Sequence, residues 1–151
     1  MYERAINGLM RALSGGANMF QPKRAIKILV INDSVDDHLL IESYLEDYGI
    51  FCLVETDVVQ GTATAIREQP DLILFDSDLP GGGGLLFLDR LRSNLPTSNI
   101  PVIVVTAQTT PDIQARARAK SAVAVLEKPI KKEELIDALR QVLGTPPTNK
   151  C

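Results

Sequence analysis

Five short apolar runs, separated by stretches with helical character, constrain the fold of this 151-residue chain more than any other feature. Each run is rich in β-branched side chains, which are typical of strands. The runs lie at 28–31, 51–54, 72–75, 102–105 and 122–126. Runs that are apolar at consecutive positions indicate strands covered on both faces, as in a parallel sheet between two layers of helices. We therefore expect an α/β, doubly wound domain with a five-stranded parallel sheet and five helices.

Helix signals occupy the intervals between these runs. Ser34, with Asp37 three residues later, resembles a capping box at a helix start. Thr110 before Pro111 predicts a second helix start, because proline at the first helical position lacks only an N–H that has no partner there. Residues 132–143 carry apolar side chains on one helical face, which predicts the last helix. In a sheet of this kind, ligands bind at the carboxyl ends of the strands.

Polar or small residues follow four of the five runs, where the predicted strands end. In chain order they are Asn32 and Asp33, Asp76 and Asp78, Thr106 and Ala107, and Lys128 and Pro129. Carboxylates gathered at one edge repel each other, and a hard cation such as Mg²⁺ relieves this by binding their oxygens. One carboxylate can then accept a phosphoryl group as a nucleophile, while an ammonium and a hydroxyl hold the transferred oxygens. Caps and turns explain each residue alone, but the combination at successive strand ends favours phosphoryl transfer.

These motifs resemble those of the response-regulator receiver family over about residues 27–143. The segments that carry the resemblance are 28–33, 70–80, 102–107 and 128–129. The resemblance implies a flavodoxin-like, CheY-like sheet with strand order 2-1-3-4-5, and Mg²⁺ as cofactor. It also implies a signalling protein that catalyses its own phosphorylation and the later hydrolysis, and not an enzyme acting on a separate substrate.

Residue by residue, the resemblance implies a complete phosphoacceptor site. Asp76 matches the phosphoacceptor, and Mg²⁺ is expected on Asp33, Asp76 and the backbone carbonyl of Asp78. Thr106 and Lys128 match the pair that contacts the phosphoryl oxygens. The other expected features are a small Ala107 that leaves room for the phosphoryl group and a cis peptide bond before Pro129, which turns Lys128 toward the site.

Two positions depart from the family pattern. Asn32 stands where most receivers carry an acid, so we expect it to reach the metal through water and to leave Mg²⁺ binding weaker. Val125 stands at the switch position, where family members often carry an aromatic ring that rotates inward on activation. Because valine has no ring to rotate, we expect any output to come from the loop after Thr106, the helix that follows it and the N-terminal segment.

Overall chain properties bound the partners. The net charge of −3 predicts no broad basic face and no direct DNA binding. No apolar run is long enough to cross a membrane, and two cysteines do not make a disulfide framework, so a cytoplasmic protein is expected. The family implies a sensor histidine kinase or phosphotransfer protein as donor and a downstream protein as target. The short sequence after residue 144 predicts a receiver without an output domain, and a homodimer is left open.

Residues 1–24 lie outside the resemblance, which leaves 25–151 as the receiver domain. Apolar residues at helical spacing in the first part predict a short amphipathic helix followed by a linker. Alone, so short a helix is marginal in water. His38, the only histidine, is expected at the surface of the first receiver helix, beside Asp36 and Asp37.

Two alternative functions belong to other classes. Asn32 and Val125 favour a pseudo-receiver, an interaction module that binds partners without being phosphorylated. A flavin-binding protein of the same architecture needs a phosphate-binding loop after the first strand. The acidic segment 32–37 argues against that function, because its carboxylates would repel a phosphate in the absence of a metal.

Overall fold

The structure is a computed structural model that describes residues 25–81 and 83–144. The predicted amphipathic helix and linker at 1–24 lie outside the described residues, so the division at residue 24 stays a prediction. The elements follow one another as β1 (Lys27–Ile31), α2 (Val35–Glu46), β2 (Phe51–Glu55), α3 (Val58–Glu68), β3 (Leu72–Asp76), α4 (Leu86–Ser93), η1 (Leu95–Thr97), β4 (Val102–Thr106), α5 (Pro111–Ala119), β5 (Ala124–Glu127) and α6 (Lys132–Leu143).

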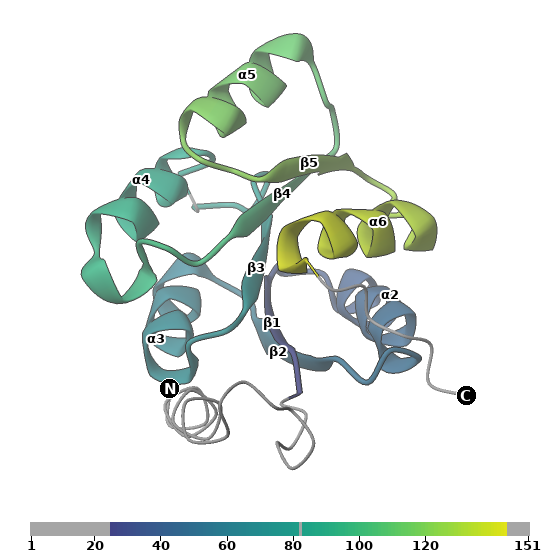
Figure 1. The fold of residues 1–151 in the computed structure, drawn as a ribbon. Helices are drawn as coiled ribbons and strands as arrows, with labels where there is room; N and C mark the ends of the chain where they lie inside the picture. Colours follow the sequence, from purple (N-terminus) through teal and green to yellow (C-terminus); the bar gives the residue numbers. More distant parts are fainter. Residues whose placement is uncertain (1–24, 82, 145–151) are drawn as a thin grey trace.

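All five strands are parallel and form one sheet in the order β2-β1-β3-β4-β5 (Figure 1). This confirms the predicted doubly wound architecture with strand order 2-1-3-4-5. The chain moves outward from β1 to β2 and then returns to the other side of β1 with β3. The switch point therefore lies between β1 and β3, and a ligand crevice is expected beyond their carboxyl ends.

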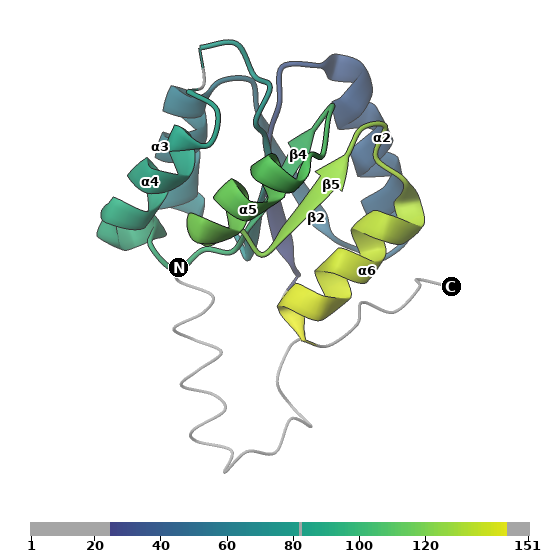
Figure 2. The ribbon, with the colours of Figure 1, turned by 90° about the horizontal axis from the view of Figure 1, so that it is seen from above.

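Alternate residues of each strand face opposite helix layers. Helices α2 and α6 cover one face of the sheet, and α3, α4 and α5 cover the other (Figures 1 and 2). In β1, Ile28 and Val30 belong to the first core, whereas Leu29 and Ile31 belong to the second. The central strands β3 and β4 are buried at every position. The edge strand β2 is less covered, and its first residue, Phe51, is 56% exposed.

The predicted start of the first receiver helix holds, whereas the start of the fifth strand shifts. Helix α2 begins after Ser34, whose hydroxyl accepts a hydrogen bond from the Asp37 amide at 3.2 Å. It ends at Glu46, and Gly49 takes its positive φ of 68° in the turn that follows. Strand β5 begins at Ala124, two residues into the apolar run, because the chain is still turning there after Ser121, which has a φ of 68°.

Within residues 25–81 and 83–144, no helix is both long and apolar enough to span a bilayer.

Candidate functional site

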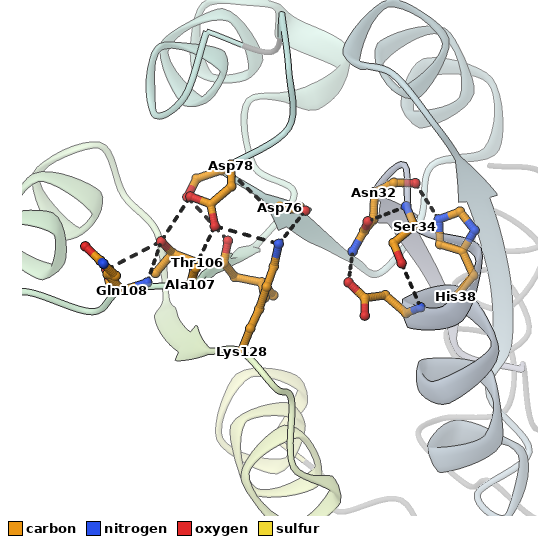
Figure 3. Close-up of polar contacts among 12 residues, drawn as sticks. Asn32, Ser34, His38, Asp76, Asp78, Thr106, Ala107, Gln108 and Lys128 are labelled. Atoms are coloured by element: carbon orange, nitrogen blue, oxygen red, sulfur yellow. Dashed lines mark hydrogen bonds and ion pairs between the residues drawn. The ribbon is translucent and has the colours of Figure 1, made fainter.

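The Asp76 carboxylate lies at the end of β3, on the carboxyl edge of the sheet, and is only 4% exposed. Both of its oxygens accept hydrogen bonds (Figure 3). Oδ2 accepts from Nζ of Lys128 at 2.8 Å, and Oδ1 accepts from the backbone amide of Asp78 at 2.8 Å. The nearly buried carboxylate is therefore held in one orientation by the Lys128 side chain, directly after β5, and by the Asp78 amide in the loop that follows β3.

The Asp78 side chain binds three groups at the edge of the site (Figure 3). Its Oδ2 accepts from the backbone amide of Ala107 at 2.7 Å, and its Oδ1 accepts from the hydroxyl of Thr106 at 3.3 Å. The ammonium of Lys128 is 3.7 Å from Oδ2. Thr106 and Lys128, the two residues predicted to contact the phosphoryl oxygens, thus both lie beside the Asp78 carboxylate.

Lys128 experiences opposing influences on its pKa. Partial burial lowers the pKa of the ammonium, whereas the hydrogen bond and charge of Asp76, together with the charges of Asp78 and Asp37, raise it. The pKa of Lys128 is raised overall, so the side chain is a cation at neutral pH. The Lys128–Pro129 peptide bond is cis, which confirms the prediction from the sequence.

The carboxylate of Asp33 follows β1 and is exposed, and the described residues provide it with no hydrogen bond or ion pair. No three histidine, cysteine or acidic side chains among residues 25–81 and 83–144 are placed to hold a metal by themselves. Mg²⁺ keeps several water ligands and needs only one or two carboxylates. A free carboxylate on Asp33, the Asp76 carboxylate and backbone oxygen in the β3 loop therefore make a donor set that suits Mg²⁺.

Asn32 is turned toward the start of α2. The side chain is 2% exposed, its Oδ1 accepts from the Ser34 amide at 2.8 Å, and its Nδ2 donates to Oδ2 of Asp37 at 3.1 Å. Both polar atoms of the amide are thus used within the β1–α2 connection (Figure 3). Its expected contact to a metal through water stays a prediction.

The expectation for His38 is wrong. The side chain is 8% exposed, and its Nε2–H donates to the backbone oxygen of Asn32. The imidazole is buried because α2 starts immediately beside the end of β1, where the carbonyl of Asn32 needs a donor. Its acidic neighbours suggested a solvated position, and nothing in the local sequence distinguishes a ring that packs inward.

The loop after β4 is anchored from two sides. Thr106 is buried at the end of β4, and Glu127 accepts from both the amide and the hydroxyl of Thr109 at 3.1 Å. At the switch position, Val125 is half-buried and packs against the core beneath α3, α4 and α5. Position 125, within β5 (Ala124–Glu127), is thus occupied by a small apolar side chain at the edge of this core.

Two site neighbours were not found from the sequence. Asp37 hydrogen bonds to Asn32 and contributes to the charge around Lys128. The hydroxyl of Tyr44 in α2 donates to the carbonyl of Ile130 at 3.1 Å, which ties α2 to the chain after the cis bond. Only the i, i+5 proximity of Asp37 to Asn32 across a helix start could have suggested the first contact, and the second joins residues 86 positions apart.

The sequence of this chain is similar to those of known signalling proteins. The family described as the response regulator receiver domain matches residues 28–140. Protein PilH of Pseudomonas aeruginosa is 31% identical over 118 residues, which are 78% of this chain and 98% of PilH. The phosphate regulon transcriptional regulatory protein PhoB of the same species is 33% identical over 116 residues, which are 77% of this chain. This chain spans about half of PhoB, 51% of its length.

Solved structures agree with the sequence relatives. The chemotaxis response regulator CheY4 of Vibrio cholerae superposes with a TM-score of 0.73 at 25% identity, over 79% of this chain and 99% of CheY4. The receiver domain of the sensor histidine kinase PA1611 of Pseudomonas aeruginosa PAO1, with a magnesium ion coordinated in its active site cleft, gives a TM-score of 0.71 at 25% identity. That match covers 81% of this chain and all of the PA1611 domain. The chain belongs to the response regulator receiver family of two-component signalling proteins.

Proposed function

We propose that this receiver is phosphorylated on Asp76, with Mg²⁺, by a histidine kinase or a phosphotransfer protein. One observation carries the proposal: the Asp76 carboxylate is nearly buried at the switch point of the sheet, with Nζ of Lys128 2.8 Å from its Oδ2. A nucleophile of this kind needs a fixed orientation and a cation to balance the charge that arrives with the phosphoryl group.

In the reaction, an oxygen of Asp76 attacks the phosphorus of the donor. The bond from phosphorus to the donor's nitrogen or oxygen breaks with its electron pair, and Asp76 becomes an acyl phosphate. Lys128 and Thr106 hold the phosphoryl oxygens, and Ala107, a small exposed residue, borders the space that the group enters. Asp33, Asp76 and the carbonyl of Asp78 would hold Mg²⁺, which would neutralise charge on the transferred group. Attack of water on the acyl phosphate later restores Asp76.

Two apolar side chains on α2 support a role in protein recognition. Leu39 is exposed and Leu40 lies at the edge of exposure, on a helix that starts beside the candidate site. We propose that this surface contacts the phosphodonor protein and that a downstream target recognises the phosphorylated state. Because a target must distinguish two states, its contacts must include a surface that changes, such as the loop between Thr106 and α5. The proposed location is the cytoplasm, and the proposal includes no direct DNA contact.

A second function, the pseudo-receiver, is favoured by one specific observation. Residue 32 is an asparagine and therefore contributes no carboxylate to the crevice. Its amide is also already hydrogen-bonded to Ser34 and Asp37. In that case the acidic site would be structural, and partners would bind one unmodified state.

Phosphorylation by a small donor separates the two functions. We expect incubation with acetyl phosphate and Mg²⁺ to add the mass of one phosphoryl group to the intact protein. Asp76→Asn and excess chelator should each abolish the addition, because one removes the nucleophile and the other the metal. Asp36→Asn is the matched control, since Asp36 is an exposed acid on α2. Unmodified wild-type protein with donor and metal in excess would leave the pseudo-receiver as the better description.

A further inference from the structure

The donors expected to hold the phosphoryl oxygens already hold an anion in this structure. We propose that the Asp78 carboxylate is a built-in occupant of the phosphoryl-oxygen positions, which holds the resting site together and must leave when Asp76 is phosphorylated. The inference rests on the proposed function and adds a regulatory device to the same site.

The contacts of Asp78 are those of a bound anion. Its two oxygens accept from the Ala107 amide at 2.7 Å and the Thr106 hydroxyl at 3.3 Å, with the Lys128 ammonium 3.7 Å away. An amide, a hydroxyl and an ammonium are also the groups that stabilise transferred phosphoryl oxygens. The Asp78 backbone amide meanwhile donates to Asp76 at 2.8 Å, so the loop places the occupant directly beside the nucleophile.

The same donors cannot serve two anions at once. The Ala107 amide has a single hydrogen, and the Thr106 hydroxyl also has one. A phosphoryl group on Asp76 would place negatively charged oxygens close to the Asp78 carboxylate, and like charges at such separations repel. One of the two anions must therefore give up these donors.

The Asp78 side chain is free to be the one that moves. It is 41% exposed, so water can solvate the carboxylate once it leaves Thr106 and Ala107. Asp76 cannot move in the same way, because it is nearly buried and ends a central strand. Phosphorylation then exchanges one anion for another on the same loop. The Ala107 amide is hydrogen-bonded in both states, and the change is carried by the released Asp78.

Asp78→Asn tests this exchange because it removes the charge and keeps the shape. We expect acetyl phosphate with Mg²⁺ to phosphorylate this variant about tenfold faster than wild type. The reason is that the donors no longer have to be released from a competing charge-assisted hydrogen bond, whose loss corresponds to a factor of about ten. Beryllofluoride with Mg²⁺ should bind more tightly by a similar factor. Glu127→Gln is the matched control, since Glu127 also accepts hydrogen bonds from this loop but at Thr109, away from the donors. It should leave both values unchanged.

Hydrogen exchange at the Ala107 amide provides a readout that needs no phosphorylation. In metal-free protein, Asp78→Ala should speed exchange of this amide about tenfold or more, because its 2.7 Å hydrogen bond is lost. Beryllofluoride with Mg²⁺ should restore protection in the variant and leave it unchanged in wild type. Asp78→Asn and Asp78→Ala both alter an exposed side chain, so we expect both variants to fold.

The outcomes separate this inference from the proposed function. Wild-type protein that is phosphorylated at the same rate as Asp78→Asn overturns the built-in anion and leaves the function standing. Equal exchange of the Ala107 amide in wild type and Asp78→Ala also overturns it. Wild-type protein that is never phosphorylated overturns both, because an anion that is never exchanged is only a structural contact.

Discussion

Asn32 and Asp37 form a hydrogen-bonded pair in which the amide and the carboxylate can be exchanged between the two positions. This exchange gives the sharpest test of the acidic site. The Asn32 amide donates to the Asp37 carboxylate at 3.1 Å, and Asn32 is almost fully buried. Asn32→Asp replaces the donor with a second carboxylate at the same short distance. From the sequence alone, this variant is expected only to tighten Mg²⁺ binding. The structure adds a cost to the metal-free state.

The cost has two parts. Loss of the hydrogen bond removes about 1 kcal/mol, and the half-buried position of Asp37 reduces the repulsion between the carboxylates to roughly 1–2 kcal/mol. We therefore expect Asn32→Asp to lower the free energy of unfolding by about 2–3 kcal/mol at pH 7 without metal. A cation nearby relieves this repulsion, so Mg²⁺ affinity should rise about tenfold, equivalent to roughly 1.4 kcal/mol.

The reversed pair, Asn32→Asp with Asp37→Asn, keeps the charge and restores an amide donor between the two positions. Its stability and its Mg²⁺ affinity should both return close to wild type. Urea unfolding in chelator measures the stability, and calorimetry measures the binding. Asp36→Asn combined with Asn32→Asp is the matched control and should restore neither. If Asn32→Asp unfolds at the wild-type urea concentration, or if the reversed pair is no more stable than the single variant, the Asn32–Asp37 contact does not govern the site.

Three further predictions concern Cys52 and Gly61, which lie in the frame around the site. Burial, and secondly the charge of Glu42, raise the pKa of the Cys52 thiol from 9.0 to about 12. In Cys151→Ser protein at pH 8, we therefore expect the thiol of the folded protein to be alkylated roughly a thousandfold more slowly than the thiol of protein unfolded in urea, as measured by mass spectrometry. Comparable alkylation rates in the two states would contradict this prediction. Because the folded state keeps this proton, Cys52 should also cause stability to fall as the pH rises above 9.0. A Cβ added at Gly61 would lie 2.6 Å from Cδ1 of the buried Ile31. Gly61→Ala should therefore lose about 1–2 kcal/mol in urea unfolding despite its better helix propensity, and Ile31→Val should recover part of this loss; a more stable single variant would show that the helix moves freely.

The sheet could be predicted from the sequence because burial on both faces leaves a local signature. The runs at 72–75 and 102–105 are apolar at every position, and they became β3 and β4, which are buried throughout. The candidate site was predictable for a related reason. Once the sheet is parallel, residues that follow different strands must meet at one edge, so Asp76 and Lys128 could be brought together although 52 positions separate them.

Side-chain partners within the site could not be predicted in the same way. Asp78 binds the loop of Ala107 across 29 positions, and the buried ring of His38 caps a carbonyl at the end of β1. Such contacts depend on rotamers and on which backbone groups lack partners after the sheet has formed, and neither leaves a periodic pattern. The η1 turn at Leu95–Thr97 is short and was missed for the same reason.

Lys128 connects the nucleophile to the built-in anion. Its ammonium is 2.8 Å from Asp76 and 3.7 Å from Asp78, so the two carboxylates share one cation. Removing the charge of Asp78 leaves Lys128 to Asp76 alone, and a stronger hydrogen bond to the nucleophile makes its lone pairs less reactive. This effect opposes the faster phosphorylation expected when Asp78 no longer competes for the donors. A rate increase that is measurable but smaller than the gain in beryllofluoride affinity would therefore be the signature of the shared lysine, because binding reports the freed donors whereas the rate also reports the nucleophile. Equal rates in wild type and Asp78→Asn would still overturn the built-in anion.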